Sequence, residues 1–168
     1  MIAKKLSIDR HGQSPPSAAP RERPQLVFSR DDTAGADKRP GRPERILVVE
    51  DDFLVAMQME SALSEAGFEV AGVASSGEEA IELAVSERPR LAVMDIRLAG
   101  ARDGIDTALQ LFAEQRIRCI FATAHHDEQA RRRAAPAIPL GWLHKPYTMV
   151  SLIGMVRSAL TELDKTRR

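Results

Sequence analysis

Two stretches of the chain are apolar at every position, which is the pattern of a strand buried on both faces of a sheet. They span residues 46–49 and 91–94. Acidic residues follow directly, Glu50-Asp51-Asp52 after the first stretch and Asp95 after the second. Because such continuous apolar strands are typical of parallel sheets, the pattern predicts a parallel sheet with carboxylates at the strand ends.

The remaining pattern alternates between helical and strand periods. Three more strands are expected near residues 68–74, 118–123 and 140–144, and helices near 53–66, 76–87, 105–115, 127–134 and 149–163. Five strands alternating with five helices predict an α/β fold with a doubly wound, five-stranded parallel sheet. Right-handed crossovers favour the flavodoxin-like strand order 2-1-3-4-5.

Residues 1–43 show neither period. They contain six of the ten prolines among Arg, Ser, Gly and Asp, and they are too poor in apolar residues to offset the entropy of ordering. The sequence therefore predicts a disordered Pro/Arg-rich tail over 1–43 and a single domain over 44–165, which suits a chain of 168 residues.

Composition narrows the class of function. The formal net charge is zero, so charge alone gives no indication of a polyanionic partner. The chain has one cysteine, Cys119, so a disulfide within the chain is excluded. Cys119 lies in an apolar run, which suits a buried thiol in a reducing compartment. We find neither an apolar run of about 20 residues nor a secretory signal, and we therefore expect a cytoplasmic protein without membrane contact.

Polar residues capable of chemistry follow four of the expected strands. Glu50 and Asp51 follow the first and Asp95 the third, so three carboxylates should meet beside the point where strand order reverses. Carboxylates this close repel one another unless a cation joins them, and Mg²⁺ is the abundant hard cation with a preference for oxygen ligands. Thr123 and Lys145, which follow the fourth and fifth strands, add a hydroxyl and an ammonium suited to a phosphoryl group.

Short motifs at these strand ends resemble the receiver domain of two-component response regulators. The resemblance covers about residues 45–165, and its motifs stand in the family's order: Ile46-Leu47-Val48-Val49-Glu50-Asp51-Asp52, Met94-Asp95, Asp103-Gly104, Thr123-Ala124 and Lys145-Pro146-Tyr147. Each motif alone is weak, but five in the right order are a strong signal together.

The resemblance implies a role for each residue. Asp95 would be the phosphoacceptor that attacks a phosphohistidine of a sensor histidine kinase or phosphotransfer protein. Glu50 and Asp51 would bind Mg²⁺ together with an oxygen of Asp95 and the backbone carbonyl of Arg97. Asp52 leaves the acidic pair ambiguous by one position, although strand alternation favours Glu50 and Asp51.

The family also implies a switch. Thr123 and Lys145 would hold the phosphoryl group, and Trp142 occupies the position of the family's switching aromatic residue. Trp142 is bulkier than the usual Tyr or Phe, so a switching role and a packing role both stay open. In this family, the positions of Arg97 and His125 tune the rate at which the acyl phosphate hydrolyses.

Other charged groups have simpler interpretations. His125, His126 and His144 lack metal-ligand spacing and are expected to be exposed loop residues. The arginines at 131–133 predict a solvated helix face, with a docking role as the second interpretation, and Asp103 is expected to be a turn residue.

The leading prediction is a stand-alone response regulator, not an enzyme, because the last expected helix runs close to the end of the chain. Its output would pass by contact with an unknown downstream protein, without direct DNA binding. The alternatives are a phosphorelay intermediate or phosphate sink, and a receiver-like module that works without phosphorylation. A haloacid-dehalogenase-like phosphatase would need an acid two residues after the nucleophile, where Arg97 stands.

Overall fold

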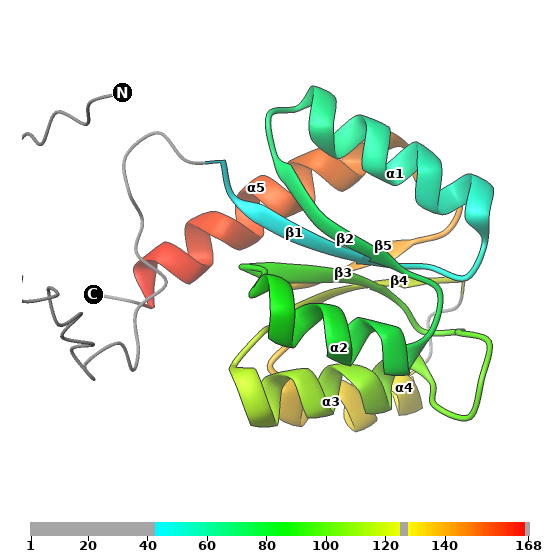
Figure 1. Cartoon of the computed structure of the whole chain (residues 1–168). Coiled ribbons are helices and arrows are strands. Elements are labelled where there is room, and N and C mark those ends of the chain that lie inside the picture. Colours follow the sequence, from blue (N-terminus) through cyan, green and yellow to red (C-terminus); the bar gives the residue numbers. More distant parts are fainter. Residues whose placement is uncertain (1–42, 125–127, 167–168) are drawn as a thin grey trace, which may run out of the picture. The chain divides into compact units, whose positions relative to one another are not determined.

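Five parallel strands form one sheet in the order β2-β1-β3-β4-β5, as the sequence predicts (Figure 1). The structure is a computed structural model that describes residues 43–124 and 128–166. The strands are β1 (Arg45–Val49), β2 (Glu69–Ala74), β3 (Leu91–Asp95), β4 (Cys119–Thr123) and β5 (Gly141–His144), and the helices are α1 (Phe53–Glu65), α2 (Gly77–Glu87), α3 (Gly104–Gln115), α4 (Glu128–Ala134) and α5 (Met149–Lys165).

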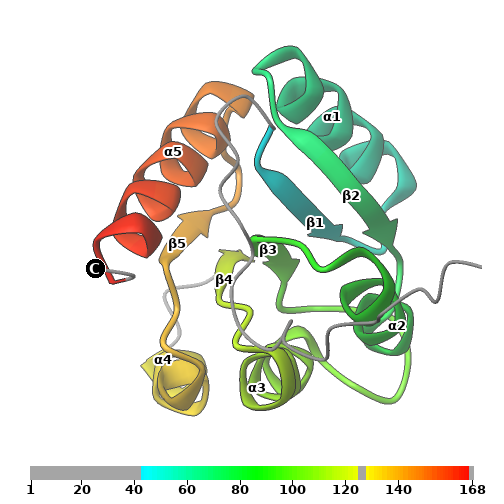
Figure 2. The same ribbon diagram turned by 60° about the vertical axis from the view of Figure 1, so that its left-hand side comes forward.

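Helices cover both faces of the sheet (Figures 1 and 2). In β1, the side chains of Ile46 and Val48 pack into the cluster formed with α1 and α5, and those of Leu47 and Val49 pack into the cluster formed with α2, α3 and α4. Both clusters are closed to solvent, which explains why β1 is apolar at every position from Ile46 to Val49.

Side chains at the strand-to-helix turns start most of the helices. Asp52, Ser76, Asp103 and Thr148 are N-caps, and each accepts a hydrogen bond from a backbone N–H of the first turn of α1, α2, α3 or α5. These turns lie at the carboxyl ends of the strands. The caps therefore fix where each helix begins relative to the polar residues that follow the strands.

The fold departs from the sequence-based expectation at two points. The register between β1 and β2 shifts so that Val70 pairs with Ile46 but Gly72 pairs with Leu47, which leaves one extra residue in β2 as a bulge. After α4 the chain continues into a 3-10 turn, Ala135–Ala137, that contains Pro136.

Ion pairs close the amino ends of the strands. Arg45 binds Glu69 at 2.9 Å and Glu87 at 2.6 Å. Two further pairs join the residues preceding β3 and β4 to the last turns of α5: Arg90–Asp164 at 2.9 Å and Arg118–Glu162 at 2.7 Å.

In the described part of the chain, no helix combines the length and the apolar character that crossing a bilayer requires. The expected tail over 1–43 lies almost entirely outside the described residues, so it stays a prediction.

Candidate functional site

Two carboxylates and one lysine meet at the carboxyl end of the sheet. Glu50 follows β1 and Asp95 ends β3, and these residues are only 3% and 8% exposed. The Nζ atom of Lys145, which follows β5, donates to Oε2 of Glu50 at 2.9 Å and to Oδ2 of Asp95 at 2.6 Å. One ammonium therefore bridges two buried carboxylates that come from different strands.

Asp51 and Asp52 have different roles although they are neighbours. Asp51 is exposed, and its Oδ2 accepts a hydrogen bond from the backbone N–H of Ala99 in the loop after β3. The Oδ1 of Asp52 accepts from the backbone N–H groups of Leu54 and Val55 at 2.9 and 3.1 Å. Asp52 therefore caps α1, and the geometry favours Glu50 and Asp51 as the acidic pair.

The carboxylates could hold a metal ion. One oxygen each from Glu50, Asp51 and Asp95 lie within 4.8 Å of one another. Three carboxylates and the Lys145 ammonium carry a formal charge of −2 when all are ionised. Hard oxygen ligands with this excess charge suit a divalent cation such as Mg²⁺.

Burial perturbs the charged groups. It raises the pKa of Glu50, and the negative charge of Asp95 adds to the shift, while Lys145 opposes it. Burial lowers the pKa of Lys145, but hydrogen bonds and attraction to Asp95 and Glu50 outweigh that effect and raise the pKa above its ordinary value. Lys145 is thus a permanent cation, whereas Glu50 is ionised at an energetic cost.

Thr123 lies beside this cluster. It ends β4, is 7% exposed, and its backbone carbonyl accepts a hydrogen bond from the N–H of Lys145 at 2.8 Å. Thr123, Asp95 and Lys145 line one small open pocket of about 150 Å³, together with Ile96, Arg97, Ala124 and Ala130. The pocket has the polar groups and the size for one phosphoryl group.

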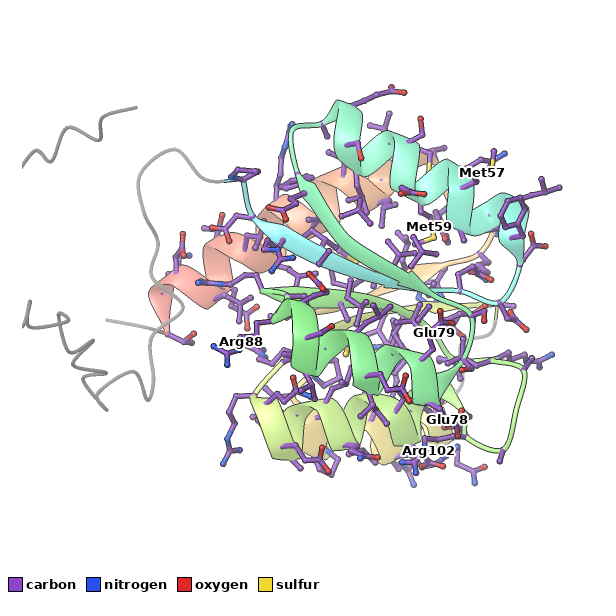
Figure 3. All side chains as sticks on the ribbon, in the orientation of Figure 1. Met57, Met59, Glu78, Glu79, Arg88 and Arg102 are labelled. Atoms are coloured by element: carbon purple, nitrogen blue, oxygen red, sulfur yellow. The ribbon has the colours of Figure 1, made fainter. Side chains whose placement is uncertain are left out.

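The backbone around Asp95 is tightly packed. The N–H of Arg97 donates to Oδ1 of Asp95 at 3.1 Å, which orients the carboxylate. A Cβ placed on Gly104 would lie 1.9 Å from the carbonyl oxygen of Asp95, so the start of α3 can approach β3 only with glycine there. The ion pair Arg102–Glu78 ties the intervening loop to α2 (Figure 3).

Trp142 lies in β5, three residues before Lys145, and does not line the pocket. It is half-buried, pairs in register with Phe121 of β4, and stacks on that ring with centroids 4.9 Å apart. On its other side, the Arg131 guanidinium carbon lies 4.7 Å from the centroid of the Trp142 ring.

The three arginines of α4 behave differently from one another. The expected solvated face fits Arg132, whose side chain is 77% exposed. Arg131 instead covers Trp142, and Arg133 pairs with Asp103 at 2.8 Å and with Asp106 at 3.0 Å. These long-range contacts have no signal in the sequence pattern. His125 and His126 lie outside the described residues. The expectation of an exposed loop residue is wrong for His144, which ends β5 and is half-buried.

A 2-1-3-4-5 sheet with an acidic triad at its carboxyl end, beside a pocket lined by a lysine and a threonine, defines a class of signalling domain. The chain matches the response regulator receiver domain over residues 46–157, and it belongs to that family.

Particular relatives sharpen this assignment. The chain is 34% identical over 119 residues to the transcriptional regulatory protein PdtaR of Mycobacterium tuberculosis, and 31% identical over 139 residues to the phyllosphere-induced regulator PhyR of Methylorubrum extorquens. The matches cover 71% and 82% of this chain but only 58% of PdtaR and 51% of PhyR. The chain thus spans little more than half the length of these curated relatives.

Among solved structures, the signal receiver domain of a modulated diguanylate cyclase from Desulfovibrio desulfuricans G20 is 35% identical, with a TM-score of 0.69 over 76% of this chain and 100% of that domain. The response regulator PhyR from Brucella abortus is 27% identical, with a TM-score of 0.63 over 75% of this chain and 51% of that protein.

Proposed function

We propose that this protein is a phosphoacceptor of a two-component system and that Asp95 takes a phosphoryl group from a sensor histidine kinase or a phosphotransfer protein. The observation that carries the proposal is the Lys145 ammonium, 2.6 Å from Oδ2 of a buried Asp95 inside an acidic triad. A purely structural salt bridge would not need two further carboxylates at the same point.

The transfer follows from this geometry. An oxygen of Asp95 attacks the phosphorus, the N–P bond of the phosphohistidine breaks, and the electron pair returns to the imidazole, leaving an acyl phosphate on Asp95. The Lys145 ammonium then pairs with a phosphoryl oxygen, and the Thr123 hydroxyl donates to another. The backbone N–H of Arg97 holds the acceptor carboxylate in place.

Glu50, Asp51, an oxygen of Asp95 and the backbone carbonyl of Arg97 would hold Mg²⁺. When bound, the ion neutralises the carboxylates and the charge on the transferred phosphoryl group. The three clustered carboxylates support this assignment.

The donor would dock beside the pocket. Among the described residues, six large hydrophobic side chains are exposed, and four of them lie at the starts of α1 and α5: Phe53, Leu54, Met57 and Val150. Both helices start at the carboxyl end of the sheet, and Figure 3 shows Met57 on the outer side of α1 while Met59 points toward the sheet. Exposed apolar side chains at the same end of the sheet as a charged pocket suit the helices of a phosphodonor protein.

The signal would leave by contact with another protein, without direct DNA binding or catalysis by this chain. Occupancy of the pocket would act through Thr123 on Trp142. Thr123 pairs with His144 of the neighbouring strand β5, and Trp142 precedes His144 by two residues. We keep the stand-alone organisation, with a tail over 1–43 and a receiver over 44–165, as part of the proposal. A relay intermediate or phosphate sink is the second candidate, since the same pocket supports it.

Intact mass after incubation with acetyl phosphate tests the proposal. We expect a Mg²⁺-dependent gain of one phosphoryl group in the wild-type protein and none in Asp95→Asn, with both proteins folded by circular dichroism. Glu162→Gln, at the other end of the sheet, is the matched acid-to-amide control and should still be phosphorylated. An adduct that survives in Asp95→Asn would contradict the assignment of the acceptor. A folded wild-type protein that takes no group from acetyl phosphate or from a histidine kinase would favour the module that works without phosphorylation.

A further inference from the structure

Although helix α4 is short, it makes contacts with three other parts of the domain. Ala130 forms part of the wall of the pocket that Asp95, Thr123 and Lys145 line. The next residue, Arg131, lies over Trp142 of β5.

The third contact reaches the neighbouring helix. Arg133 pairs with Asp103, the N-cap of α3, and with Asp106 in its first turn. Figure 2 shows α4 beside α3 and below β5, so the two arginines fasten one seven-residue helix in two directions.

The groups that Arg133 and Arg131 contact, Asp103 and Trp142, are both close in structure to the residues of the pocket. Asp103 precedes Gly104, which packs closely against the carbonyl of Asp95. Trp142 stacks on Phe121, which precedes Thr123 by two residues and faces the same side of the sheet. The position of α4 therefore depends on the same strands and helix that build the pocket.

From these contacts, and resting on the proposed function, we propose that Arg131 and Arg133 are positioning residues that clamp α4 as a wall of the phosphoacceptor pocket. The clamped helix keeps Ala130 against the pocket, limits the access of water to the acyl phosphate, and holds Trp142 stacked on Phe121. Hydrolysis is then faster when α4 leaves its place, and the hydrolysis rate rises with the population of the released state.

Arg132 supplies a matched control because it lies between the two clamp residues, is largely exposed, and pairs with Glu128 of its own helix. The test compares Arg131→Met, Arg132→Met and Arg133→Met after phosphorylation by acetyl phosphate and removal of the donor, with the decay of the acyl phosphate followed by intact mass. We expect a lifetime about two- to fivefold shorter for Arg131→Met and Arg133→Met, the factor that corresponds to loss of one cation–π or surface ion pair. Arg132→Met should match the wild type.

Trp142 is the only tryptophan of the chain, so its fluorescence reports the clamp directly. Arg131→Met should shift the emission to longer wavelength and increase quenching by acrylamide, and Arg131→Lys should restore part of both properties because the charge returns over the ring. Arg133→Met combined with Asp106→Asn should shorten the lifetime no further than Arg133→Met alone, since the same pair is broken.

Equal acyl-phosphate lifetimes in all three methionine variants would overturn the clamp, because Arg132→Met should keep the wild-type lifetime. If the wild-type protein takes no phosphoryl group, the proposed function fails by itself. The fluorescence of Trp142 then still decides the clamp: a change in both Arg131→Met and Arg133→Met but not in Arg132→Met supports it. A change confined to Arg131→Met, or identical spectra for all three variants, overturns it.

Discussion

The two ends of the sheet handle charge in opposite ways. At the amino ends of the strands, Arg45, Arg90 and Arg118 are shared among four carboxylates that all keep partial contact with water. At the carboxyl ends, one ammonium faces three carboxylates, and two of the three are nearly closed to solvent.

The difference separates charge that supports the fold from charge that supports chemistry. The paired, partly exposed ions at the amino end change the free energy of unfolding little, and they leave no excess charge for a ligand to neutralise. The buried acidic excess at the carboxyl end is costly on its own and becomes favourable when a cation neutralises it.

The largest effect is expected from Lys145→Met. Removing the ammonium leaves Glu50 and Asp95 buried without their shared donor, and we expect the free energy of unfolding to fall by about 1–3 kcal/mol. Mg²⁺ should recover part of the loss, because it replaces the missing positive charge. Urea unfolding with Mg²⁺ and with EDTA measures both values. No difference between the two conditions would argue against an ion at the triad.

Gly104→Ala should cost about as much through sterics alone. The new Cβ would overlap the carbonyl of Asp95, so β3 and α3 must separate, and overpacking of this kind costs about 1–3 kcal/mol. Gly154→Ala in α5 is the control. A Cβ placed on Gly154 would meet none of the described atoms within 4 Å, and alanine should stabilise the helix by about 0.5–1 kcal/mol. Equal effects at both glycines would refute the close approach at Asp95.

Glu50→Gln should change the pH dependence of stability in EDTA. The pKa of folded Glu50 lies above its ordinary value of 4.5, so the folded state binds more protons than the unfolded state as the pH rises from about that value. Ionisation of Glu50 therefore destabilises the wild-type protein as the pH rises through the folded pKa. The stability of Glu50→Gln relative to wild type should increase over the same window in urea unfolding, and a constant difference would contradict the shift.

The smallest effect is expected from Glu162→Gln. Its carboxylate is 48% exposed, and the Arg118 side chain keeps its hydrogen bond to the carbonyl of Ile138. Loss of the pair should cost about 0.2–1 kcal/mol, with no dependence on Mg²⁺. A larger, Mg²⁺-dependent loss would remove the distinction between the two ends of the sheet.

Much of the fold can be predicted from the sequence because the buried strands β1, β3 and β4 each contain an unbroken apolar run that leads into a polar residue. Right-handed crossovers leave few topologies, and the structure confirms the favoured strand order 2-1-3-4-5. The meeting of Glu50, Asp51 and Asp95 also follows, since parallel strands bring their carboxyl ends to one edge.

Contacts between side chains distant in sequence could not be predicted. The adjacent acids Asp51 and Asp52 look alike in the sequence, and only the direction of the chain into α1 gives Asp52 to the helix cap. The three arginines of α4 look equally solvated, and the helix position relative to α3 and β5 alone distinguishes them. The bulge in β2 is not predicted either, although a glycine inside a strand, here Gly72, is a common sign of one.

The bonds from Lys145 span most of the domain: its partners Asp95 and Glu50 lie 50 and 95 positions earlier in the chain. A chain that has folded only its first strands would carry the acids without the ammonium. The complete cluster of charges thus forms only after β5 has joined the sheet, so its assembly requires strands from nearly the whole length of the domain.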